Sequence, residues 1–317
     1  MIAAHADWSI DPAKRFTTIG RKAGGFWVLD VPRLTGDVAA LLPRLARAAG
    51  GEAVVLGIDC PIGLPLAYAA QLDGLPNFPV FLRGLHPESP FFQVAREIEE
   101  VSLARPFYPA GTVVGMGHKL ALAQKLGMGE PRKMSRLVDL ATASRPAAGQ
   151  LFWTLGPNQC GKAALAAWRD VLLPGLTTLP MRLWPFDGPL RELAARGSIT
   201  VAETYPAEAM RHLGIKLEGS KRAQAARQAV ACQIFDAMNR LNVRRPIELT
   251  LAVGKGFGTA PNADDAFDSL IGALGLINVL TGNRPDAPPG PVDMWEGWVL
   301  GQTELPVMED GATEVLF

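Results

Sequence analysis

Two short, strongly apolar segments that each end in an acid constrain the fold of this chain most. Residues 53–59 read AVVLGID, residues 198–203 read SITVAE, and a proline follows each segment within three positions. Because both alternating faces of these segments are largely apolar, each is expected to be a strand covered by helices on both sides, as in a parallel sheet. Their last residues, Asp59 and Glu203, are therefore expected at the carboxyl edge of that sheet, where ligands collect.

The other elements follow from periodicity and turn residues. The first thirty residues predict a β-meander with strands at 2–8, 15–19 and 26–31. Helices are expected over 38–49, 119–126, 163–172, 206–213, 221–241 and 264–280, and a further strand over 247–253. A meander, a helix and then parallel strands with helices is the order of a ribonuclease H-like α/β sheet, in which the first three strands are antiparallel and the next two are parallel.

The segment between the two apolar strands determines the expected domain organisation. It holds about 140 residues rich in Pro and Gly, far more than a crossover connection needs. We therefore expect one ribonuclease H-like domain over residues 1–317, with an inserted segment, 66–197, that forms a lid or a helical subdomain.

The charge balance argues against a long nucleic-acid footprint. The chain has 31 basic and 31 acidic residues, whereas proteins that cover long stretches of duplex usually carry a basic excess that neutralises phosphates. One local exception is the segment 210–245, which holds eight basic and two acidic residues. It is interpreted as a solvated helix face, with a phosphate-binding surface as the alternative.

The location expected from the sequence is cytoplasmic. The three cysteines are far apart and show neither a disulfide framework nor the spacing of a zinc site. The first residues lack the basic and apolar regions of a signal peptide, and no apolar run is long enough to span a bilayer. No membrane association is expected.

Acids from four separate segments are the main candidates for chemistry. Asp7 lies in the first apolar segment, and Asp265 and Asp268 share one face of the last predicted helix, with Asp264 interpreted as a helix-start charge. Taken singly, each acid has a structural explanation such as a cap or an ion pair. Gathered at one end of a sheet, such acids suit Mg²⁺ or Mn²⁺. Two such ions would activate a water and stabilise the leaving oxygen of a phosphodiester.

Three motifs carry a resemblance to a known family. GIDCPIGLP (57–65), VAETYPAEAMRHLG (201–214) and DDAFDSLIGALG (264–275), after an early Asp in the first strand, resemble the uncharacterised domain-of-unknown-function 429 family, described as predicted ribonuclease H-like nucleases. The resemblance extends from Asp7 to the EGWVLG segment at 296–301. It implies that Asp7 matches the first-strand acid, Asp59 the fourth-strand acid, and Asp265 with Asp268 the acids of the final helix.

These observations lead to one main hypothesis and two alternatives. The main hypothesis is a Mg²⁺- or Mn²⁺-dependent nuclease or phosphodiesterase acting on a nucleic acid or nucleotide. Its predicted catalytic residues are Asp7, Asp59, Glu203, Asp265 and Asp268. Four of these, Asp7, Asp59, Asp265 and Asp268, are predicted metal ligands, whereas Glu203 would assist or position water. The alternatives are a nucleotide-binding phosphotransferase of the actin and sugar-kinase type, which the zero net charge favours mildly, and a non-catalytic binding domain. The last predicts that the acids do not converge or that a basic side chain takes the place of the metal.

Three basic residues are further candidates for substrate binding. Lys221 and Arg222 begin the predicted helix 221–241. Lys162 lies in GPNQCGKA (156–163), which partly resembles a phosphate-binding loop but has Ala163 where a hydroxyl should ligate Mg²⁺.

Overall fold

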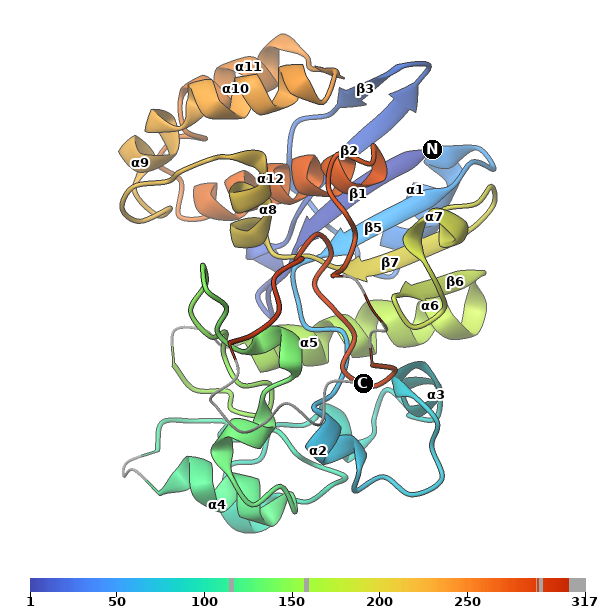
Figure 1. Ribbon diagram of the computed structural model, residues 1–317, viewed down its shortest axis with the longest axis vertical. Helices are drawn as coiled ribbons and strands as arrows, with labels where there is room; N and C mark the ends of the chain where they lie inside the picture. Colours follow the sequence, from blue (N-terminus) through green and yellow to red (C-terminus); the bar gives the residue numbers. More distant parts are fainter. Residues whose placement is uncertain (114–116, 157–159, 289, 291–292, 308–317) are drawn as a thin grey trace. The chain divides into compact units, whose positions relative to one another are not determined.

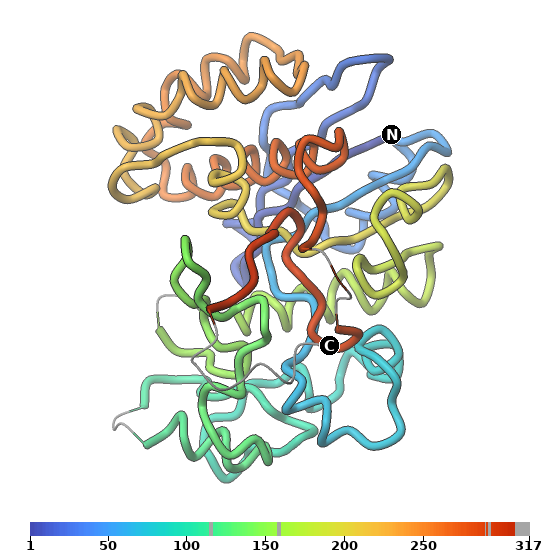
Figure 2. The backbone as a smooth tube through the Cα atoms, in the orientation of Figure 1, coloured from blue at the N-terminus to red at the C-terminus, as the bar shows by residue number. Residues whose placement is uncertain are grey.

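The computed structural model describes residues 1–113, 117–156, 160–288, 290 and 293–307, and these form two compact units. The first, which we call the sheet unit, comprises Met1–Asp59, Leu179–Ala287 and Val299–Gln302. The second unit comprises the described residues of Cys60–Thr178 and Pro288–Trp298 and those after Gln302. The chain thus leaves the sheet unit after Asp59 and re-enters it at Leu179 (Figure 2).

The sheet unit is built on one eight-stranded mixed sheet in the order β6-β7-β5-β1-β2-β3-β8, with β4 paired to β2. The strands are β1 (Ile2–Asp7), β2 (Phe16–Ala23), β3 (Phe26–Leu29), β4 (Arg33–Leu34), β5 (Val54–Ile58), β6 (Met181–Trp184), β7 (Ile199–Glu203) and β8 (Val243–Arg244). Strands β1, β2 and β3 pair antiparallel, whereas β5 pairs parallel with β1, and β7 pairs parallel with β5. The mixed α/β class predicted from the sequence is confirmed.

The two apolar segments form the strands β5 and β7 inside the sheet, as predicted from the apolar residues on both of their faces. Every residue of β5 and of β7 is buried, because neighbouring elements cover both faces. The prediction for 247–253 is wrong: this segment is helix α11 (Ile247–Gly254). Apolar residues at 247, 249, 251 and 253 alternate as in a strand. In a helix, however, the i, i+4 pair Leu249 and Val253 lies on the buried face, and the pair Ile247 and Leu251 lies on the exposed face.

Helices pack around the sheet. They are α1 (Leu41–Ala49), α7 (Leu190–Leu193), α8 (Pro206–Leu213), α9 (Gln224–Ala229), α10 (Ala231–Arg240), α11 and α12 (Ala263–Leu280). The longest, α12, lies across β1 and β2 and beside α8 (Figure 1). The predicted helix 221–241 is divided into α9 and α10 at Val230. In the part of the chain that the structure describes, no helix has both the length and the apolar character needed to cross a bilayer.

A close contact fixes α12 on the sheet. The imidazole of His5, in β1, is fully buried against Gly272, where an added Cβ would lie 2.2 Å from Nε2. Burial lowers the pKa of His5 to about 3, so the ring is neutral. Thr18 Oγ1 and Ser269 Oγ share a hydrogen bond of 2.8 Å on the same face.

Gly272→Ala is expected to lower the free energy of unfolding by about 1–3 kcal/mol, because the new methyl must displace α12 or the imidazole. Gly254→Ala is the matched control, since a Cβ there meets nothing within 4 Å, and it should leave stability unchanged or raise it slightly. Urea unfolding monitored by circular dichroism measures both variants. Equal stabilities would show that α12 does not depend on this contact.

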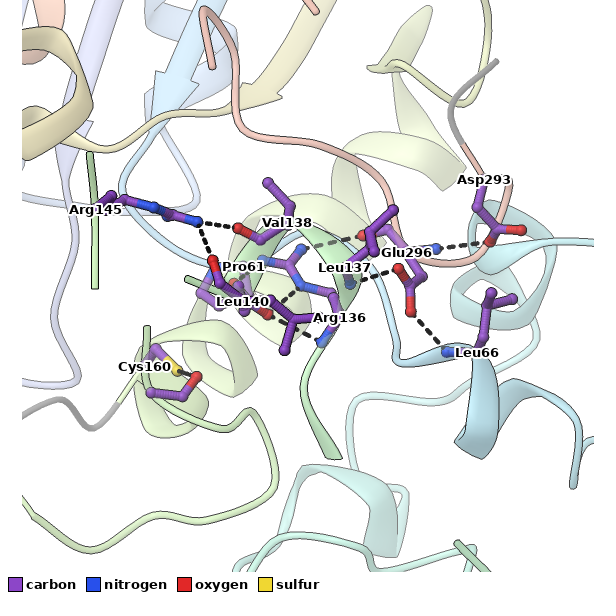
Figure 3. A network of polar contacts seen from close by, with 12 residues as sticks. Pro61, Leu66, Arg136, Leu137, Val138, Leu140, Arg145, Cys160, Asp293 and Glu296 are labelled. Atoms are coloured by element: carbon purple, nitrogen blue, oxygen red, sulfur yellow. Dashed lines mark hydrogen bonds and ion pairs between the residues drawn. The ribbon is translucent and has the colours of Figure 1, made fainter. Parts of the chain in front are cut away.

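The described part of the second unit carries five short α-helices, several 3₁₀ turns and a network of buried charges. The helices are α2 (Leu66–Ala69), α3 (Phe78–Arg83), α4 (His118–Lys125), α5 (Cys160–Ala167) and α6 (Leu173–Thr178), the last two joined by the π-helical segment Trp168–Leu172. Arg136 lies at the centre of the network and donates to both carboxylate oxygens of Asp139. It also donates to the main-chain oxygen of Glu296 (Figure 3). The Glu296 carboxylate accepts from the backbone N–H groups of Leu66 and Leu137. The network therefore joins three distant segments of this unit.

Candidate functional site: a carboxylate cluster around Lys221

Asp7 and Asp59 end adjacent parallel strands on the same face of the sheet. Asp7 is the last residue of β1, and Asp59 follows the last residue of β5. The backbone N–H of Asp59 donates to the carbonyl of Ala6 at 3.0 Å, which continues the parallel register by one residue. This register sets Asp7 opposite Asp59, and directly opposed residues project to the same side.

Helix α12 adds two more acids over this face. Asp268 is almost completely buried, with 2% of its side chain exposed, and Asp265 is partly exposed one turn earlier. Both influence the pKa of Asp7, which places them in its electrostatic neighbourhood. The structure therefore brings together four of the five predicted acids: Asp7, Asp59, Asp265 and Asp268.

The ammonium group of Lys221 lies among these acids. Lys221 belongs to the turn before α9, and its Nζ donates to Asp268 Oδ2 in a short ion pair. Burial opposes the charge of Lys221, but attraction to Asp268, Asp59 and Asp7 is stronger and raises its pKa above the usual value. Its side chain is still 46% exposed, so the ammonium reaches into the cluster from the solvent side.

One ammonium does not neutralise the cluster. Burial, together with repulsion from Asp268 and Asp59, raises the pKa of Asp7 well above its ordinary value. Burial is also the main reason why the pKa of Asp59 rises to about 7 and that of Asp265 to about 6. Asp7 and Asp59 are close enough for each to influence the pKa of the other. The cluster thus retains protons near neutral pH because it lacks positive charge.

The donor set fits a hard divalent cation, although the side chains do not form a coordination group as they stand. Asp268 Oδ1 and Asp265 Oδ2 are buried and have no hydrogen-bond partner among the described residues, and carboxylate oxygens are the ligands that Mg²⁺ and Mn²⁺ prefer. The described ranges contain no group of three or more His, Cys, Asp or Glu side chains that could hold a metal ion. Lys221 is the cation that stands in this place, and a metal ion would have to displace it from Asp268.

Glu203 does not share the face of the other acids. It is in register with Ile58, one residue before Asp59, so its side chain leaves the sheet on the opposite face. Thr204 lies on the cluster's face instead. Its side chain and the imidazole of His5 both pack against Gly57. Glu203 is fully buried and raises the pKa of Asp59, so it acts on the cluster through its charge and from the other face of the sheet.

The predicted basic candidates have different positions. Arg222 is exposed beside Lys221, and its backbone N–H donates to Ser220 Oγ. Lys162 lies in α5 of the second unit, and three residues of its loop, 157–159, lie outside the described residues. Gly161 beside it is required by packing, because a Cβ would lie 2.2 Å from the carbonyl of Leu151.

Arg227 is a functional candidate that the sequence analysis missed. It belongs to the basic segment interpreted as a solvated helix face, yet only 2% of it is exposed. Its guanidinium donates to the carbonyls of Gly256, Gly258 and Lys221. An arginine among alanines gives no sequence signal of this role, because the three acceptors are main-chain atoms. Arg227 holds the backbone that carries Lys221.

Comparisons of this chain with protein-family models, with curated proteins and with solved structures give no match. The chemistry of the cluster is therefore the guide to its function.

Proposed function

We propose that the sheet unit is a ribonuclease H-like hydrolase that cleaves phosphodiester bonds with Mg²⁺ or Mn²⁺ held by Asp7, Asp59 and Asp268, with Asp265 at the rim. The observation that carries the proposal is the convergence of buried carboxylates from three separate segments, whose charge a single ammonium compensates only in part. Lys221 in the place of the metal is also what the non-catalytic alternative predicts, and the metal titration described below decides between the two. Burying several like charges is unfavourable unless a cation compensates them, and a single half-exposed lysine leaves the compensation incomplete.

The sheet supports the same proposal. Strands β1, β2 and β3 are antiparallel, and β5 and β7 extend the sheet from β1 in parallel, as expected for a ribonuclease H-like domain; β6 and β8 are further parallel strands at the two edges. The acids lie at the ends of β1 and β5 and on α12, the last helix of the sheet unit. These are the positions that the family resemblance implies for a metal site.

Each residue of the cluster has a defined part in the proposed reaction. A bound divalent cation would supply a water of lowered pKa and neutralise charge on the phosphate. Asp268 would exchange its bond with Lys221 for the cation, and Asp7 and Asp59, whose pKa values are raised in the metal-free fold, would bind the ion in their ionised form. The Lys221 side chain, released and already half exposed, would then pair with a phosphate oxygen of the substrate.

Metal affinity is the first test. Asp268→Asn is expected to weaken Mn²⁺ binding at least about tenfold, because it removes the most buried ligand. Lys221→Gln is expected to strengthen binding, because the cation no longer competes with an ammonium. Asp236→Asn, at an exposed position of α10, should match the wild type. Mn²⁺ titration followed by electron paramagnetic resonance measures all four proteins.

The same proteins are then assayed with Mn²⁺ on single-stranded DNA, single-stranded RNA and bis(p-nitrophenyl) phosphate. We expect hydrolysis of at least one by the wild type and none by Asp268→Asn. Unchanged Mn²⁺ binding in Asp268→Asn, or no hydrolysis of any of these substrates, would contradict the proposal.

A further inference from the structure

An apolar groove lies next to the carboxylate cluster in the sheet unit. Its volume is about 510 Å³, and its lining includes Phe16, Leu251, Lys255, Phe257, Ala263 and Ala266. Leu251 is 52% exposed, and both phenylalanines are partly exposed. These apolar surfaces are therefore accessible to a ligand.

The groove and the cluster share two elements. Phe16 in β2 is the direct register partner of Asp7 in β1, and the Cβ atoms of such partners lie about 4.5–5.5 Å apart on one face. On α12, Ala263 and Ala266 line the groove, while Asp265 between them belongs to the cluster. Phe16 therefore places one wall of the groove beside Asp7, whereas on α12 Asp265 leaves the helix about 100° away from Ala266, on a neighbouring side of the same turn.

The backbone of the groove is held in a strained conformation. Phe257 has φ 61°, a left-handed value that is uncommon for a bulky residue, and it lies between Gly256 and Gly258, which also have positive φ. Arg227 donates to the carbonyls of both glycines, at 2.8 and 2.7 Å. The same guanidinium donates to the carbonyl of Lys221. One buried side chain therefore fixes both the aromatic wall of the groove and the cation of the cluster, and strain of this kind concentrates at ligand-binding sites.

We propose that this groove binds the nucleobase of the nucleotide whose phosphate is cleaved at the carboxylate cluster. This inference rests on the proposed function and specifies its substrate as a single-stranded nucleic acid or a nucleotide. Phe16 and Phe257 offer aromatic surfaces for stacking, and Glu248, Lys255 and Asn262 supply polar groups at the groove. The chain has no net charge, so it lacks the basic excess by which many proteins hold a long phosphate backbone, and base contacts in the groove would add to the few phosphate contacts at the cluster.

The test separates base recognition from metal and from hydrolysis. The probe is 2-aminopurine riboside, which has no phosphate, titrated in EDTA with its fluorescence as the readout of stacking. We expect quenching by the wild type that adenosine reverses and ribose does not. Phe257→Leu should weaken binding about five- to 150-fold, the range for loss of a stacking surface, and Leu251→Ser should weaken it through loss of apolar contact. Ile247→Ser is the matched control, because this side chain of the same helix is exposed but does not line the groove.

The outcomes distinguish the two proposals. Absence of quenching, or equal weakening by Leu251→Ser and Ile247→Ser, overturns the nucleobase site, whether or not phosphodiester hydrolysis is found. Self-association that Leu251→Ser abolishes, without riboside binding, assigns the groove to a second copy of the chain and also overturns it. Binding that the groove variants weaken supports the site even if no hydrolysis is detected, in which case the hydrolase proposal alone fails.

Discussion

Replacing Arg136 by methionine is expected to destabilise the second unit by about 3–5 kcal/mol, the usual effect of removing one partner from a buried ion pair. The Arg136 side chain is fully buried and that of Asp139 is 2% exposed. Two hydrogen bonds of 2.8 and 3.0 Å join them. Without the guanidinium, the Asp139 carboxylate would be buried with its charge uncompensated, and the main-chain oxygen of Glu296 would lose a donor.

Hydrogen exchange of the amides in 60–178 measures this effect within the unit concerned. Arg169→Met is the matched control, because its ion pair with Asp170 is partly exposed, at 44% and 29%, and such pairs contribute about 0–1 kcal/mol. The double variant Arg136→Met, Asp139→Leu should recover much of the loss, since it removes both charges. Equal protection in Arg136→Met and Arg169→Met would show that the buried pair contributes no more than an exposed one.

The parts of the fold that could be predicted from the sequence are those set by local apolar patterning. The strands around Val55 and Val201 are apolar on both faces, and this alone indicates central positions in a sheet. Asp59 was predictable as a strand-end acid because a proline follows it and prevents the strand from continuing. Helix α12 was predictable from its long run of apolar residues from Phe267 onward, and these residues are buried in the structure.

The composition of the site was less predictable because it depends on register and on loop conformation. The segments that end at Asp59 and Glu203 look equivalent in sequence, but a register offset of one residue puts their carboxylates on opposite faces. Lys221 was a candidate for binding a substrate phosphate, whereas its partner in the structure is Asp268. That contact is set by a turn whose backbone Arg227 holds through a main-chain carbonyl, which no spacing in the sequence reveals.

Asp59→Asn is expected to lower the rate of phosphodiester hydrolysis about 100-fold or more. The same substitution is expected to stabilise the metal-free protein at pH 8. The sign of the stability change follows from its pKa, which rises from 3.8 in the unfolded chain to about 7 in the fold. Such a carboxyl group favours the folded state below pH 3.8, and this contribution is lost as the pH rises through 7. At pH 8 the ionised group opposes folding, and asparagine removes that penalty. Because Asp59 keeps some contact with solvent, the expected gain is about 1–3 kcal/mol.

The pH dependence separates this explanation from a general effect on packing. At pH 5 the folded protein keeps Asp59 protonated, so wild type and Asp59→Asn should differ by less than at pH 8. Asp236→Asn, which is exposed on α10, should follow the wild type at both values. Saturating Mn²⁺ should reverse the order at pH 8, because only the wild type gains the binding free energy of the ion. A variant that loses activity and is destabilised equally at both pH values would instead show that Asp59 serves the fold. A variant that loses activity but is more stable than the wild type at pH 8 without metal would support the proposed role. It would show that Asp59 contributes repulsion to the metal-free fold and that this repulsion favours binding of a cation.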